Sequence, residues 1–181
     1  MRNELGNMQY FTPELFLKLN SSDSETVDEA MEQWERAIAS YRKRLQKIRS
    51  EMPSQSRSIA ELSVHDWNLL KVVPNPNTAD LDGAAPAAFI VLKHNKNFVV
   101  LWYLLSENLR VIDAPKDWSV SRKRVHWLYD ELDANGDDRE SFIHRILCSD
   151  GTTLLVPFSS CRVLQVQSDH AMSHSDLMQI A

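Results

Sequence analysis

The sequence predicts an α+β protein. N-terminal helices, including one long helix at about 23–51, are followed by an antiparallel β-meander of about six to seven strands. Two observations predict this order: an apolar heptad seam in the first third of the chain, and later short apolar runs that turn residues separate. We therefore expect a single domain over 1–181, with a helical part at 1–66, a sheet part at 67–167 and a mobile tail at 168–181.

A capping box opens the long helix. Ser22 and Glu25 stand three residues apart, the spacing at which the two side chains cap each other's backbone amides. Pro53 ends the helix because proline lacks the amide hydrogen that a helical turn needs. The helix is then about 29 residues, or roughly 43 Å, long. Apolar side chains recur along it at alternating steps of four and three residues, which is a heptad seam: Val27, Met31, Trp34, Ile38, Tyr41, Leu45, Ile48 and Met52.

This seam needs a partner along its whole length. A short helix is predicted just before it, with Thr12 as its cap, Pro13 in its first turn and apolar residues that include Phe16 and Leu19. A second capping box, at 58–61, opens another short helical segment. Neither segment approaches the seam in length, so together they should cover only part of it. We therefore expect the long helix either to lie across the sheet or to pair with a second copy of itself.

The sheet is predicted from runs of apolar or alternating residues. Asn95 to Asn97 and Asp150-Gly151 are hairpin connections, and the second is a strong turn signal because its central residues tolerate positive φ. The spacing leaves no room for helices between the strands, which favours antiparallel pairing. The predicted strands lie at 88–94, 98–106, 109–113, 125–132, 142–149, 153–158 and 161–167.

Composition narrows the function classes. The chain has 43% apolar and 25% charged residues, and its net charge of −5 disfavours wholesale binding to nucleic acid or to an anionic membrane. The two cysteines cannot build a disulfide scaffold and fit a reducing compartment, as small buried residues. No secretory signal is recognised at 1–11, and the longest apolar run, at 98–105, is far shorter than the roughly 20 residues of a membrane helix. We expect a cytoplasmic protein without a membrane partner.

Motifs for nucleotide or covalent chemistry are absent from the sequence. The four glycines are not clustered, which excludes a P-loop and a Rossmann turn, and there is no G-x-S-x-G, paired C-x-x-C or H-E-x-x-H motif. No cofactor is therefore predicted, apart from a divalent metal in one alternative. Five aromatic residues either line a ligand groove on the sheet or pack in the core: Trp102, Tyr103, Trp118, Trp127 and Tyr129.

Histidines and aspartates suggest that metal site. If 125–132 and 142–149 form a hairpin about Asn135, His126 stands opposite His144 with Cβ atoms about 5 Å apart. The hypothesis is a metal or acid–base site built from paired strand residues and one dipeptide, namely His65, Asp66, His126, Asp130 and His144. The alternative is structural: Asp66 closes a turn, and each histidine is a half-buried residue bonded to backbone.

Charge on the long helix is divided into an acidic first half and a basic second half. This order complements the helix dipole and also suits antiparallel self-pairing, in which unlike halves of two copies meet. We expect a protein contact here, on Trp34, Tyr41, Arg42, Arg44 and Leu45. Nucleic-acid binding by the basic half, from Arg42 to Arg49, is an alternative that the acidic net charge disfavours.

Two stretches carry a resemblance to known sequences. LSVHD at 62–66, and FIHRILCSDG at 142–151 with Pro157 and Phe158, resemble uncharacterised bacterial proteins of the domain-of-unknown-function kind. In these proteins a helical part is followed by an H-D dipeptide and an antiparallel sheet. The resemblance implies a bacterial cytoplasmic setting and the α+β arrangement, and it brings no established activity, cofactor or catalytic residue.

We expect a non-enzymatic protein-binding module that acts through the long helix or the sheet and forms a homodimer. Whether the natural partner is a second protein, as for a toxin-neutralising immunity protein, stays open. The first alternative is a metal-dependent hydrolase that uses the His/Asp cluster, with a bound ion that lowers the pKa of a water molecule. The second alternative is nucleic-acid binding.

Overall fold

Among the residues that the structure describes, three helices precede the sheet. The computed structural model describes residues 7–74, 86–120, 123–135 and 140–167. The predicted tail at 168–181 lies outside these residues. The helices are α1 (Pro13–Leu19), α2 (Ser24–Glu51) and the 3-10 helix η1 (Ser54–Glu61).

The N-cap of the long helix is Asp23, one residue later than the expected Ser22, and the helix begins at Ser24. The Asp23 carboxylate, rather than the Ser22 hydroxyl, accepts a hydrogen bond from the Thr26 amide at 3.0 Å, and it also accepts from the Thr26 hydroxyl. An aspartate at this position adds a negative charge at the positive end of the helix dipole, which the serine cannot supply. The helix ends at Glu51, with Met52 as its C-cap and Pro53 following, as predicted.

Seven strands in the described part of the chain form one antiparallel sheet, so the predicted α+β class is confirmed. The order in the sheet is β1-β2-β3-β7-β6-β5, and β4 also pairs with β7. β7 joins two meanders, because its later half pairs with β3 and its earlier half pairs with β6. The strands are β1 (Asn68–Pro74), β2 (Ala87–His94), β3 (Asn97–Leu105), β4 (Arg110–Ile112), β5 (Trp127–Ala134), β6 (Phe142–Cys148) and β7 (Thr153–Gln167).

Two of the predicted strands are in fact one. The runs at 153–158 and 161–167 are continuous in β7, since Ser159 and Ser160 continue the strand where a turn was expected. The pairing partner changes at this point: Phe158 faces both Leu105 and Phe142, whereas Ser160 faces Leu104. One long strand therefore spans both meanders.

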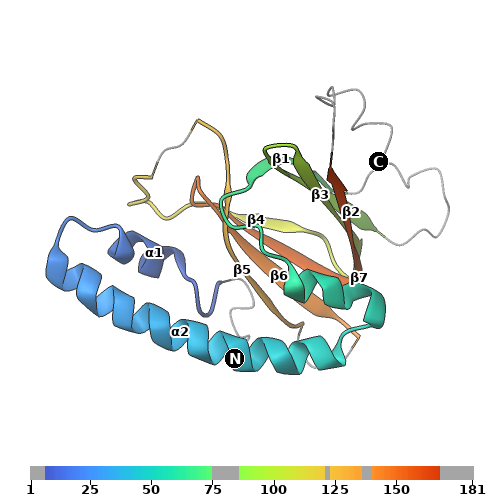
Figure 1. Cartoon of the computed structure of the whole chain (residues 1–181), viewed down its shortest axis with the longest axis horizontal. Helices are drawn as coiled ribbons and strands as arrows, with labels where there is room; N and C mark the ends of the chain where they lie inside the picture. The colour runs from blue at the N-terminus through green and yellow to red at the C-terminus, as the bar shows by residue number, and fades with distance from the viewer. Residues whose placement is uncertain (1–6, 75–85, 121–122, 136–139, 168–181) are drawn as a thin grey trace.

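The sheet curls into a half-barrel whose ends approach each other (Figure 1). The Asp66 amide donates to the carbonyl oxygen of Trp127 at 2.8 Å, and the Trp127 amide donates to the carbonyl oxygen of Trp67 at 2.9 Å. Leu69 and Val125 are joined in the same way at 2.9 Å. These bonds link the start of β1 to the start of β5.

The interior of the curled sheet is the main hydrophobic core. Inward-facing residues of the strands, among them Ile90, Leu101 and Tyr103, are fully buried there. The end of α2 and the helix η1 close one end of this core with Ile48 and Ile59. Helical and sheet parts therefore share a single core.

A second cluster lies between α2 and the outer face of β5 and β6. Tyr41 of α2 packs there against Leu128 and Leu147, together with Phe11 and Phe16 from the preceding chain. The flanking helical segments cover only part of the seam, as expected, and the N-terminal segment at 8–11 and the outer sheet face cover most of the rest. Of the two arrangements expected for α2, the structure contains the one in which the helix lies on the sheet (Figure 1).

A buried carboxylate holds the N-terminal segment in place. Glu131 of β5 accepts hydrogen bonds from the amides of Gln9, Tyr10 and Phe11, each at 2.7 Å. Its strand neighbour Arg145 is also buried and lies directly opposite it in β6. Burial raises the pKa of Glu131, while the three amides and the Arg145 charge oppose that rise.

We predict that Glu131→Gln destabilises the fold by about 3 kcal/mol or more, because the buried Arg145 guanidinium loses one of its two nearby carboxylates, with Asp133 remaining, and one amide faces an NH₂ group. Denaturant unfolding measures the change. The exposed Glu35→Gln is the control, with an expected effect within about 0.5 kcal/mol. Equal stabilities for the two variants would contradict the role of Glu131.

Candidate functional site

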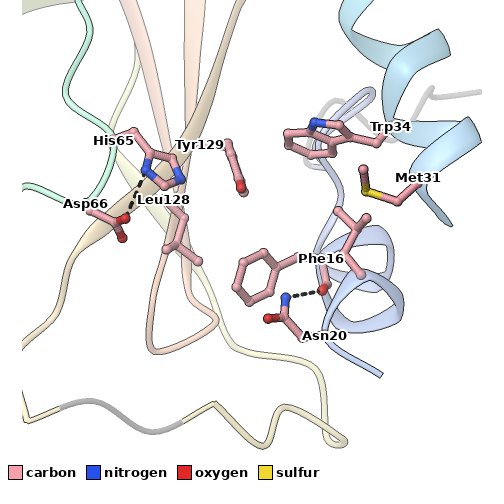
Figure 2. Close-up of a pocket in the computed structure, with 9 residues that line it drawn as sticks. Phe16, Asn20, Met31, Trp34, His65, Asp66, Leu128 and Tyr129 are labelled. Atoms are coloured by element: carbon pink, nitrogen blue, oxygen red, sulfur yellow. Dashed lines mark hydrogen bonds and ion pairs between the residues drawn. The ribbon is translucent and has the colours of Figure 1, made fainter. Parts of the chain in front are cut away.

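An open cleft lies between the two N-terminal helices and the place where the curled sheet nearly closes. Its volume is about 400 Å³, within the range of pockets that hold small ligands or side chains of a partner. Figure 2 shows its lining, which combines apolar and polar side chains and comes from α1, α2, the segment before β1 and β5. The lining residues are Phe16, Leu19, Asn20, Met31, Trp34, His65, Asp66, Leu128 and Tyr129.

Aromatic rings build the wall of this cleft. Tyr129 stands between Trp34 and His65, with ring centroids 4.6 and 4.9 Å away (Figure 2). Phe16 closes the α1 side and stacks on Trp118 at 5.3 Å. Each ring of the wall contacts at least one other ring, so the rings support one another.

Met31 differs from the other seam residues of α2 in its exposure to solvent. Its side chain is 48% exposed, whereas every other seam residue is buried or half-buried. Asp28 and Glu35 lie three residues before and four residues after it, so they share its side of α2, and both are exposed. An apolar side chain is thus presented to solvent between two carboxylates.

The side chains of His65 and Asp66 lie against each other at the opposite wall. The His65 Nδ1 and Asp66 Oδ2 atoms are 3.1 Å apart, and each side chain is 48% exposed. The Trp67 amide bonds to the Val64 carbonyl oxygen at 3.1 Å, which closes a turn with Asp66 at a φ of 61°. Aspartate tolerates this left-handed conformation better than most residues. The H-D dipeptide is therefore a turn that directs its two side chains into the cleft.

Asp130 and His144 meet inside the sheet. The His144 Nε2 atom lies 3.0 Å from an Asp130 carboxylate oxygen, and its Nδ1 atom lies 2.8 Å from the Tyr103 hydroxyl. The Trp127 indole donates to the other Asp130 oxygen at 3.0 Å. His144 is fully buried, and burial raises the pKa of Tyr103. This chain of polar groups is satisfied internally and is structural.

The predicted five-residue metal cluster is not formed. His144 lies opposite Leu132 rather than opposite His126, so the predicted hairpin register is wrong. The pairing partner of His144 is shifted by six residues, from His126 to Leu132. Because side chains alternate between the two faces of a strand, an even shift keeps His144 on the same face as Asp130. His126 precedes β5, and its Nδ1 atom lies 3.0 Å from the carbonyl oxygen of Asp66.

The five residues therefore occupy two places: the His65–Asp66 turn, with His126 beside it, and the buried Asp130–His144 pair. Across the residues that the structure describes, no group of three or more histidine, cysteine or acidic side chains is arranged to hold a metal ion.

Three of the residues predicted to bind a partner are engaged within the chain. The Tyr41 hydroxyl accepts a hydrogen bond from the Leu132 amide at 2.8 Å, and Arg44 forms an ion pair with Asp133. Leu45 packs at the edge of both hydrophobic clusters. These side chains hold α2 on the sheet.

The other two, Trp34 and Arg42, are accessible to different degrees. Trp34 is half-buried in the cleft, and Arg42 is exposed on the solvent side of α2. Met31 is the one strongly exposed large apolar side chain of α2.

Antiparallel pairing of two copies along this helix would therefore bury charged groups rather than an apolar seam, and it remains a prediction.

The sequence did not predict that the residues lining the cleft lie close together. Phe16 and Leu19 were expected in the short helix, and Tyr129 was one of the aromatic candidates, but no pattern places them beside His65. Of the other aromatic candidates, Trp127 and Tyr103 are buried in the core.

Both cysteines are sealed in the core. Burial raises the pKa of Cys148 to about 12 and raises that of Cys161 as well. The interpretation of both as small buried residues agrees with their position.

Comparison of the chain with protein-family models, with curated proteins and with solved structures found no match. The resemblance at 62–66 and 142–151 therefore stays a prediction. None of the helices among the described residues is long and apolar enough to cross a membrane.

We predict that Tyr103→Phe costs about 1–3 kcal/mol of stability, since it leaves a buried His144 nitrogen without its partner. Urea unfolding measures this cost. The hydroxyl of Tyr129 points into the cleft (Figure 2), so Tyr129→Phe serves as the control with an effect within about 0.5 kcal/mol. A neutral Tyr103→Phe would show that the chain of polar groups contributes nothing.

We also predict that neither thiol of the folded protein reacts with Ellman's reagent at mildly alkaline pH, because the reactive thiolate is suppressed by burial. Both thiols should react once denaturant is added. The absorbance of the released thionitrobenzoate follows the reaction, and rapid labelling of the folded chain would contradict this prediction.

Proposed function

We propose that the chain is a non-enzymatic protein-binding module, and that its partner docks in the cleft between α1, α2 and β5. The observation that carries the proposal is the exposed Met31 side chain at an aromatic wall. Methionine and aromatic residues are enriched where proteins bind each other, and an aromatic wall orders few side chains on binding.

The cleft also indicates what a partner presents. An apolar side chain of the partner fits between Met31, Trp34 and Tyr129. A basic group beside it fits the exposed carboxylates Asp28 and Glu35 on the same side of α2. A toxin-neutralising role of the immunity type, in a bacterial cytoplasm, is one form that such a partnership takes.

The alternative functions have less support. The residues of the hydrolase hypothesis are divided between the His65–Asp66 turn and the buried His144 pair. In the basic half of α2, Arg44 is paired with Asp133 and Arg49 is paired with Glu61.

The proposal is tested by panning a random peptide library, displayed on phage, against the immobilised full chain. We expect selected peptides whose affinity, measured by fluorescence anisotropy, falls about tenfold or more on Met31→Glu. The matched control is Leu164→Glu, an exposed leucine on another part of the molecule, which should leave their affinity unchanged.

Circular dichroism confirms that both variants remain folded. If no peptide is selected, or if every selected peptide binds Met31→Glu as tightly as the original chain, the cleft is not a protein-binding site.

A further inference from the structure

The outer face of the sheet is unusually apolar for a surface. Side chains alternate along β3, so that Leu101 and Tyr103 enter the core while Trp102 and Leu104 point outward. Trp102 is 36% exposed, Leu104 is 38% exposed, and Leu164 of β7 is 45% exposed. Isolated exposed leucines are ordinary, but adjacent ones on neighbouring strands are typical of interaction surfaces.

The strand register makes these residues neighbours. Trp102 lies opposite Phe89 of β2 on one side and opposite Arg162 of β7 on the other. Its indole stacks on the Phe89 ring at 5.7 Å, and the Arg162 guanidinium lies 5.6 Å from the indole centroid. We call Phe89, Trp102, Leu104, Arg162 and Leu164 the outer sheet patch.

Charge on these strands has one sign. β1, β2, β3 and β7 contain no aspartate or glutamate, although the whole chain has a net charge of −5. Their charged residues are Lys71, Lys93 and Arg162. The outward-facing Lys93 and Arg162 both lie over aromatic rings, of Phe98 and Trp102. The patch therefore combines apolar surface with positive charge.

We propose that the outer sheet patch is a second docking surface, and that it binds a segment of another protein in which aromatic or leucine side chains alternate with glutamate or aspartate. The carboxylates of such a segment would pair with Arg162 and Lys93, and its apolar side chains would cover Trp102 and Leu164. Tryptophan and arginine are the residues that most often dominate the energy of protein interfaces.

Other occupants fit the patch less well. A nucleic-acid base needs a free aromatic face on which to stack, but Phe89 and Arg162 already flank Trp102 on both sides. A second copy of this chain would bring two patches of the same positive sign together, which is unfavourable.

This surface is separate from the cleft. The cleft lies at α1 and the start of β5, whereas β2 and β3 lie on the right of the view in Figure 1, away from α1. The acidic cleft and the basic patch would accept segments of opposite charge. The chain could then hold two different protein segments at once, which goes beyond the single docking site proposed above.

The patch is tested with the same phage-displayed library on the full chain, after clones that bind Leu164→Glu have been removed. We expect acidic peptides with aromatic or leucine residues. Their affinity should fall about tenfold or more on Arg162→Glu, fall less on Arg162→Lys, and decrease as ionic strength rises. Met31→Glu in the cleft is the matched control and should bind them as the original chain does.

Three results would overturn this inference. The first is that no selected peptide depends on Leu164, or that the dependent peptides carry no negative charge. The second is binding of labelled oligothymidylate that Arg162→Glu abolishes. The third is light scattering that gives twice the 20.8 kDa chain mass, and a single chain mass for Leu164→Glu. Each is independent of whether Met31→Glu weakens binding at the cleft.

Discussion

The packing of α2 on the outer face of β5 and β6 is the constraint on which the rest of the structure depends. A helix of this length needs apolar cover along its seam, and the cover comes from the sheet together with the N-terminal segment. The Glu131 carboxylate fixes that segment by accepting three amide hydrogen bonds within a low-dielectric environment. The cleft exists because this cover stops short of Met31, where α1, the His65–Asp66 turn and Tyr129 surround the gap.

The curled sheet separates the chemistry of the molecule into sealed and accessible groups. His144, Tyr103 and both cysteines lie inside it, and burial raises the pKa of Tyr103 and of both thiols. The accessible surfaces are the cleft and the outer sheet patch, where aromatic and apolar side chains reach solvent. Asp28 and Glu35 lie beside the first, and Arg162 lies in the second. Such a division suits a protein that recognises others, since its surface carries the recognition and its interior carries the stability.

Most of the elements were predictable, because they depend on local patterns, but β1 was not among the predicted strands, and the helix expected to open at 58–61 instead ends at Glu61. The heptad seam, the cap near Ser22 and Pro53 determine α2 to within one residue, and the hairpin turn at Asp150-Gly151 determines the β6–β7 connection. Pairing register was predicted less well. The register between β5 and β6 depends on how the whole outer face of β5 is packed, and it includes a bulge between Trp127 and Tyr129. No local sequence pattern predicts that bulge.

The candidate site follows the same division. The H-D dipeptide, the seam and the residue Trp34 were chosen from the sequence for separate reasons, as a metal site and as a partner surface. Only the tertiary structure shows that His65, Asp66 and Trp34 share one cleft, and that His126, Asp130 and His144 do not form a site with them. Helices and turns are determined over a few neighbouring residues, so the chain alone predicts them. A cleft is determined by which distant segments pack together, and that depends on how all the apolar faces are covered at once.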